Sequence, residues 1–180
     1  MSEYTRVVIL CEDRQQEVFA RHFLINCGIR KQRIYAKVAP KGLGSGEQYV
    51  REEYPEEVGS YRRFCNHKNI SLVVLIDADM NTVTDRLKKL EDELVNASLA
   101  KRQPDEKIAI FVPKRNIETW ISYLQDQTQT IDEEKEYPKY KKESACKPFA
   151  EKLSANRNQA LPENAPSSLK AACDELPRIL

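Results

Sequence analysis

The sequence predicts an α/β fold in which four parallel strands form one sheet with helices on both faces. Three observations support this prediction. Short apolar runs alternate along the chain with longer helical patterns, which is typical of a parallel sheet. The run Leu72 to Ile76 is wholly apolar, as expected of a strand that is buried on both faces. The chain has 180 residues, which is enough to bury a hydrophobic core without stabilising cross-links.

The spacing of apolar residues divides the chain into strands and helices. Runs rich in apolar and β-branched residues predict strands at 6–11, 33–39, 72–77 and 108–112. Helical spacing predicts helices at about 15–26, 47–67, 82–100 and from residue 116 onward. Pro55 is expected to interrupt the second of these and start a new helix, because proline suits a first helical turn. Arg86 is placed on the solvated face of the third helix.

Residues 1–125 are predicted to form the main domain. From Gln125 the chain becomes polar, so residues 126–180 are predicted to be a surface linker followed by a small helical C-terminal appendage. The apolar positions of this last part indicate two short helices around Pro162 and Pro166.

The composition restricts the class of protein. The 29 basic and 28 acidic residues nearly cancel, which argues against an overall basic coat for nucleic acid but leaves local patches open. Five widely spaced cysteines include no Cys-x-x-Cys pair, which argues against a zinc ribbon or a thioredoxin-like site. No signal peptide or membrane span is predicted, so we expect a cytoplasmic protein that has no membrane partner.

Two aspartates directly follow the apolar strand at 72–77. Side chains at positions i and i+2 of an extended chain point to the same side, so Asp77 and Asp79 should emerge together. They would lie at the carboxyl end of the strand, where open α/β sheets keep their sites. Paired carboxylates favour a hard divalent cation such as Mg²⁺. Asp79 could instead cap the next helix, although Thr82 and Asp85 already form a typical capping pair.

Charged residues also follow two other predicted strands. Glu12 follows the first strand and Glu118 follows the fourth, so both could join a divalent-metal site at the same edge of the sheet. Alternatively, Glu12 could pair with Arg14 or Arg115. Glu118 could complement a helix N-terminus or pair with Lys114. Lys114 and Arg115 precede a helix start, where cations oppose the helix dipole, and this favours a phosphate or carboxylate partner for them.

A glycine-rich stretch at 40–46 follows the second predicted strand. Its backbone N–H groups, with Lys41, Gly42 and Gly44, could contact phosphate. The stretch is not a Walker A loop, because the Gly-Lys-Ser/Thr sequence is missing. A flexible turn remains the alternative.

The carboxylate motifs together resemble the TOPRIM fold, which topoisomerases, primases and OLD-type nucleases share. The stretch 11–19 resembles the Glu-Gly-x-x-Glu/Asp opening of small TOPRIM-like proteins, and Asp77-x-Asp79 resembles the second diagnostic motif. The stretch 113–120 resembles an Arg-x-Ile-Glu-x-Trp segment of TOPRIM-like proteins that are encoded near defence ATPases. The resemblance covers about residues 5–125. Asp13 replaces the usual glycine, and Gln16 stands where a second acid is common.

The resemblance implies a metal-dependent nuclease that hydrolyses DNA phosphodiesters. Mg²⁺ or Mn²⁺ would be held by Glu12, Asp77 and Asp79, with Glu118 supporting a second ion and Glu17 a weaker candidate ligand. Lys114 and Arg115 would contact the scissile phosphate, and the glycine-rich stretch with Lys41 would contact the DNA backbone.

The resemblance also implies that the chain acts as the effector of a partner ATPase in phage or plasmid defence. Two alternatives remain open. The chain could be a non-catalytic TOPRIM-like subunit that binds a partner protein, or a Mg²⁺-dependent phosphatase acting on small molecules.

Overall fold

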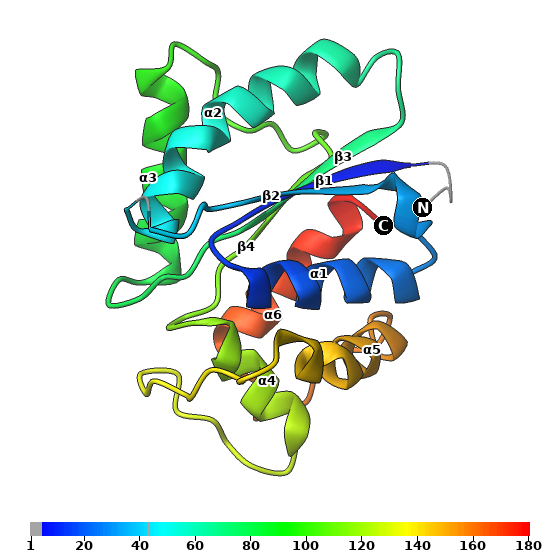
Figure 1. The fold of residues 1–180 in the computed structure, drawn as a ribbon, viewed down its shortest axis with the longest axis vertical. Helices are drawn as coiled ribbons and strands as arrows, with labels where there is room; N and C mark the ends of the chain where they lie inside the picture. The colour runs from blue at the N-terminus through cyan, green and yellow to red at the C-terminus, as the bar shows by residue number, and fades with distance from the viewer. Residues whose placement is uncertain (1–4, 43) are drawn as a thin grey trace.

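The computed structural model describes residues 5–42 and 44–180, which form an α/β fold (Figure 1). One all-parallel sheet has the strand order β2-β1-β3-β4. Its strands are β1 (Arg6–Cys11), β2 (Ile34–Val38), β3 (Ile70–Leu75) and β4 (Ile108–Phe111). The predicted class and the four parallel strands are therefore confirmed.

The central pair of strands, β1 and β3, sets the register of the sheet. Val8 lies opposite Leu72, and Cys11 lies opposite Leu75. All six residues of β3 are buried, as a central parallel strand requires. Strand β3 begins and ends two residues earlier than predicted, but the chain continues to pair with the β4 side. The Ile76 amide donates to the Phe111 carbonyl at 3.2 Å, and the Ala78 amide to the Pro113 carbonyl at 2.8 Å.

Helices cover both faces of the sheet (Figure 1). One hydrophobic cluster packs one face under the helices α1 (Arg14–Asn26), α4 (Ile117–Gln125), α5 (Lys147–Ala155) and α6 (Ser167–Glu175). A second cluster packs the other face under α2 (Gly46–Phe64) and α3 (Val83–Asn96). Short 3₁₀ turns lie at Lys31–Arg33, Glu143–Cys146 and Leu176–Arg178. None of the described helices has the length and apolar character needed to cross a membrane.

The C-terminal third takes part in the core of the sheet. Leu153 of α5 and Leu169 of α6 belong to the same buried cluster as Val73 of β3. The Trp120 indole Nε1 of α4 donates to the Ser168 hydroxyl at 2.8 Å. The two helices predicted for the appendage are present, and this packing joins them to the main domain through one continuous core.

Helix α2 shows that the effect predicted for Pro55 is wrong. The helix runs without interruption from Gly46 to Phe64, with Pro55 inside it. Proline removes one helical hydrogen bond, to the carbonyl of Arg51. The buried side of the helix offsets this cost, because Val50, Tyr54 and Val58 are almost completely buried against the sheet. Tertiary packing therefore decides the course of this helix.

The shared core predicts that α6 stabilises the whole domain. Leu169→Ala should lower the free energy of unfolding by about 2–5 kcal/mol, because it removes a fully buried side chain and leaves a cavity. The matched control is Val95→Ala on α3, where the side chain is half exposed, and it should change stability by less than about 0.5 kcal/mol. Urea unfolding measures both. Equal effects would show that α6 is not part of the cooperative core.

Candidate functional site

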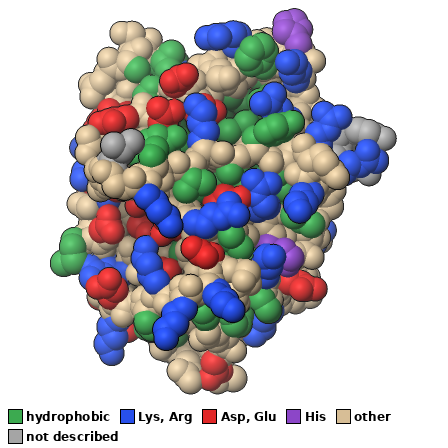
Figure 2. Space-filling view, viewed as in Figure 1, with side chains coloured by type: hydrophobic (Ala, Val, Ile, Leu, Met, Phe, Trp, Pro, Cys, Tyr) green, Lys and Arg blue, Asp and Glu red, His purple; other side chains and the backbone are tan. Residues whose placement is uncertain are grey.

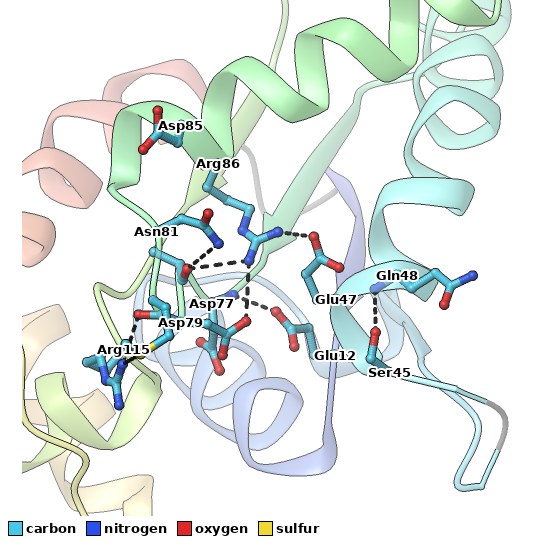
Figure 3. A network of polar contacts seen from close by, with 12 residues as sticks. Glu12, Ser45, Glu47, Gln48, Asp77, Asp79, Asn81, Asp85, Arg86 and Arg115 are labelled. Carbon is cyan, nitrogen blue, oxygen red and sulfur yellow. Dashed lines mark hydrogen bonds and ion pairs between the residues drawn. The ribbon is translucent and has the colours of Figure 1, made fainter.

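The carboxyl ends of β1, β3 and β4 meet around one hollow, which we call the acidic hollow. Figure 3 shows Glu12, Asp77 and Asp79 grouped at this edge, with Arg115 beside them. The side chains and backbone that line it are Glu12, Asp13, Gly46, Asp77, Asp79, Met80, Arg115, Asn116, Glu136 and Lys139. The structure therefore brings together the carboxylates predicted to follow the first and third strands.

Hydrogen bonds hold Glu12 and Asp77 in fixed positions. Glu12 Oε1 accepts from the Asp77 amide at 2.5 Å, which joins the end of β1 to the end of β3. Gln16 connects the same two residues, since its Oε1 accepts from the Glu12 amide at 2.9 Å and its Nε2 donates to Asp77 Oδ1 at 2.8 Å. Gln16 is fully buried. This side chain therefore orients the Asp77 carboxylate.

Asp13 stands where the resembling proteins have glycine, and it starts helix α1. Its Oδ1 accepts from the Gln16 amide at 2.9 Å, which is an N-cap hydrogen bond. Its Oδ2 pairs with Lys139 Nζ at 2.8 Å. The replacement therefore supplies a helix cap, and it also adds a carboxylate and an attached lysine to the acidic hollow.

Arg86 lies beneath the carboxylates, so the prediction that it sits on a solvated face is wrong. It is only 1% exposed, and Figure 3 shows it between Glu47 and Asp79. It pairs with Glu47 Oε1, and its Nη2 lies 3.3 Å from Asp79 Oδ2 and 3.4 Å from the Ala78 carbonyl. Arg86 precedes the buried Leu90 by four residues, so its helical spacing could have revealed this position.

Asp79 holds a strained backbone conformation at the mouth of the hollow. Its φ is 54°, which is a left-handed conformation. This conformation is uncommon for residues other than glycine and costs conformational energy. The side chain is about half exposed. Arg86 contacts its carboxylate. Arg115 donates to its carbonyl at 3.5 Å and also contacts the Met80 sulfur. The tight turn after β3 therefore directs Asp79 to solvent beside the buried Asp77.

Glu118 brings an unpartnered carboxylate to this edge. It lies in the first turn of α4 and is 1% exposed, and both carboxylate oxygens lack a hydrogen-bond partner among the described residues. Burial raises its pKa above the ordinary value. Its charge is close enough to Asp77 to raise the pKa of that carboxyl as well. The structure thus brings Glu118 to the vicinity of Asp77.

Negative charge is in excess here. Burial, together with the charge of Asp79, raises the pKa of Glu12 to about 7. Burial and the charge of Glu12 raise the pKa of Asp77 well above its ordinary value. The acids at this edge outnumber the bases: they are Glu12, Asp13, Glu47, Asp77, Asp79, Glu118 and Glu136, against Arg86, Arg115 and Lys139. A bound proton or cation would relieve the repulsion.

No group of three or more His, Cys, Asp or Glu side chains in the described part of the chain could hold a metal ion as these side chains stand. The prediction that Glu12, Asp77 and Asp79 share one cation therefore stays a prediction. Mg²⁺ is commonly bound through one or two carboxylates, with water and substrate phosphate completing its shell. A Mg²⁺ site of this kind does not need three carboxylates that bind the ion directly.

Other predicted site residues lie outside the acidic hollow. Lys114 is tied to the loop after β3, since its Nζ donates to the Asn81 carbonyl at 2.9 Å and pairs with Glu134 at 3.2 Å. Glu17 is buried between Arg14 and Arg21, with which it forms two ion pairs. Neither residue is among those that line the hollow.

The glycine-rich stretch contributes one residue that the sequence analysis did not select. Lys41, Gly42 and Gly44 are exposed and do not line the hollow. Gly46 lines it instead, because the start of α2 presses against Glu12. A Cβ at Gly46 would lie 2.7 Å from Glu12 Cβ and 2.9 Å from its carbonyl oxygen.

Lys139 is the site cation that sequence reasoning missed. It belongs to the polar segment predicted as a linker, where a lysine among other charges gives no local signal. The structure folds this segment over the carboxyl edge, and Lys139 reaches Asp13 there. Asp13 and the other carboxylates of the hollow raise the pKa of Lys139.

The contact between Gly46 and Glu12 predicts opposite effects of two alanine substitutions in one helix. Gly46→Ala should lower the free energy of unfolding by about 1–3 kcal/mol, because its Cβ would collide with the backbone of Glu12. Gly59→Ala is the control, with open space around it, and it should raise stability by up to about 1 kcal/mol. Chemical unfolding measures both. A neutral Gly46→Ala would contradict the close approach.

The raised pKa of Glu12 predicts how stability changes with pH in metal-free protein. The folded state holds the proton of Glu12 more tightly than the unfolded chain does. This contribution is therefore complete below about pH 4.5 and is lost as the pH rises through about 7. Glu12→Gln removes the carboxyl that titrates. The free energies of unfolding of the parent and the variant should therefore diverge by on the order of 1 kcal/mol per pH unit in this window. Urea unfolding in EDTA tests this, and a pH-independent difference would contradict it.

Comparison with protein-family models, with curated proteins and with solved structures finds no match to this chain. The assignment of a function therefore depends on the geometry and charge of the acidic hollow, together with the resemblance of the short motifs that form it.

Proposed function

We propose that the protein is a TOPRIM-type nuclease that hydrolyses DNA phosphodiesters with Mg²⁺ or Mn²⁺ bound at the acidic hollow. The observation that carries the proposal is the buried, unpartnered carboxylate of Glu118 near Asp77. A buried carboxylate without a partner is costly, and the cost is relieved by a proton or by a cation. The placement of Glu12 after β1 and of Asp77 and Asp79 after β3 agrees with the TOPRIM resemblance.

The residues of the hollow are suited to a hard divalent ion. Glu118 is buried behind the hollow and does not line it, but its charge acts on Asp77, which does. Asp77 and Glu118 would hold the ion from the inner side, with Glu12 and Asp79 at the same edge to balance its charge. All four offer oxygen atoms, which Mg²⁺ and Mn²⁺ prefer. A bound ion of this kind polarises a phosphoryl oxygen and lowers the pKa of a bound water.

The residues of the chain would position a phosphodiester beside these carboxylates. Arg115 and Lys139 line the hollow and would contact the phosphate oxygens, where they would stabilise developing negative charge. Lys139 would exchange its bond with Asp13 for one with phosphate. Arg86 remains buried and offsets the charge of Glu47 and Asp79 from the inner side of the hollow. Gln16 keeps the Asp77 carboxylate oriented throughout.

The proposal includes a partner. The sequence has no Walker A motif, so an ATP-driven step would come from another protein. We place the chain in the cytoplasm as the effector of such an ATPase in phage or plasmid defence. This part of the proposal is supported by the resemblance of the motifs alone.

The proposal predicts that DNA cleavage depends on a metal ion and on Asp79. With Mg²⁺ or Mn²⁺, and with any ATPase encoded nearby, the protein should cut plasmid DNA, and EDTA should stop it. Asp79→Asn should slow cleavage by about 10²–10³, because one charge is lost at the mouth of the hollow. Asp92→Asn, an exposed acid on α3, is the matched control and should cleave like the parent. Lys139→Gln should slow cleavage by a similar factor, and Lys114→Gln by less.

Each alternative outcome has a distinct meaning. Cleavage that Asp79→Asn leaves unchanged would place the activity elsewhere. Turnover of small phosphate esters without DNA cleavage would favour the phosphatase alternative. Calorimetric titration with Mn²⁺ should detect binding to the parent and none to Asp77→Ala. No metal binding and no cleavage under any condition would favour a subunit that binds a partner.

A further inference from the structure

A second hollow lies at the opposite end of the strands, between the edge strand β2 and helix α2. Its wall and floor residues include Arg6, Val8, Tyr35, Tyr61, Phe64 and Lys68, and we call it the aromatic groove. Figure 1 shows α2 running at an angle to the sheet, so that its C-terminal end stands further from the strands than its start. This divergence leaves Val8 of β1 only partly covered.

The aromatic side chains of the groove are unusually exposed. Tyr35 is 48% exposed and Phe64 is 36% exposed, although large apolar side chains elsewhere in the described chain are mostly buried. Tyr61, by contrast, is fixed as a wall, because its hydroxyl oxygen accepts from the Lys107 amide at 2.8 Å. The groove therefore offers two accessible rings beside a rigid apolar surface.

A cation lies over each exposed ring. The Arg6 guanidinium is 4.4 Å from the centre of the Tyr35 ring, and the Lys68 ammonium is 4.7 Å from the centre of the Phe64 ring. Arg63 also lies 6.0 Å from the Phe64 ring. Among the described residues, no carboxylate forms an ion pair with any of these three cations. Their charge is thus available to an anionic ligand.

The charge of this end of the molecule differs from that of the acidic hollow. In Figure 2, Lys and Arg side chains gather on the right of the upper half, where the chain begins, and most Asp and Glu side chains of that half lie on the left. Glu56 and Glu57 also line the groove; Glu57 is paired with Lys37, which also pairs with Glu53, whereas Glu56 is exposed to solvent. Arg6, Arg63 and Lys68 therefore outnumber the one lining acid that has no ion pair among the described residues. Arg6 of the groove and Glu12 of the acidic hollow lie at opposite ends of β1, about 20 Å apart along the strand.

We propose that the aromatic groove binds a segment of single-stranded nucleic acid. Tyr35 and Phe64 would stack on bases, and Arg6, Arg63 and Lys68 would contact phosphates. Single strands present flat rings and negative charges in alternation, and exposed aromatics with adjacent cations match both features. An acidic peptide would use the cations without the rings, and an apolar peptide would use the rings without the cations. Binding here needs neither a metal ion nor cleavage, so it goes beyond the function proposed for the acidic hollow.

The test is the affinity for a fluorescein-labelled oligothymidine, followed by fluorescence anisotropy in EDTA. Tyr35→Ala and Phe64→Ala should each raise Kd about tenfold, since one base–aromatic stack is lost. Val95→Ala removes an exposed apolar side chain from α3 and should leave Kd unchanged. Lys68→Gln should reduce the slope of log Kd against log salt by about 0.7, the value for one phosphate contact on a single strand. Lys89→Gln, with the same charge change on α3, is its control.

Three results would overturn the proposal. The first is no binding at low salt. The second is binding that Tyr35→Ala and Phe64→Ala leave unchanged, which would show a purely electrostatic association. The third is a Tyr35→Ala variant whose Kd for the oligonucleotide is unchanged but whose oligomeric state, measured by light scattering, differs from that of the parent. That result would show that the groove contacts another copy of the protein. Circular dichroism confirms that each variant is folded. Because EDTA is present throughout, loss of nuclease activity alone would leave this result unaffected.

Discussion

The hydrogen bond from the Asp77 amide to Glu12 Oε1 joins the two central strands at their carboxyl ends, and the acidic edge depends on it. It follows from the register of the parallel pair, in which Cys11 lies opposite Leu75. A shift of one residue would turn the core-facing side chains of a strand to the other face and would also separate the two carboxylates. Apolar burial, which fixes the register, therefore also assembles the site.

Arg86 reduces the repulsion between the carboxylates that this register brings together. Carboxylates on neighbouring strand ends repel one another, and burial raises the pKa of Glu12 and Asp77. A buried arginine from α3 offsets part of the charge through Glu47 and Asp79, and an excess of negative charge remains. The negative charge of the carboxylates is therefore only partly neutralised. Incomplete neutralisation of buried charge is more typical of functional sites than of purely structural networks.

The two ends of the sheet have different chemical characters. The carboxyl end carries acids on tight turns, and the amino end carries exposed rings with cations over them. The angle of α2 to the sheet leaves the second surface open, since this helix covers Val8 of β1 only partly. If both proposals hold, the groove would retain a single strand at one end of the molecule while the acidic hollow acts at the other.

Local patterns in the sequence determined much of this protein. Apolar runs determined four strands and placed Glu12, Asp77 and Asp79 directly after two of them. That these two strands are neighbours, so that the three carboxylates share one edge, was decided by the tertiary structure. Only the tertiary structure decided which side chains complete that edge. Three helices, α1, α2 and α3, bring Gln16, Gly46 and Arg86 to this edge, and the polar segment after α4 brings Lys139. Their roles depend on which surfaces meet when the two cores close, and local spacing does not encode that. For the same reason, burial against the sheet overrode the expected break at Pro55, because packing energy exceeds the cost of one missing helical hydrogen bond.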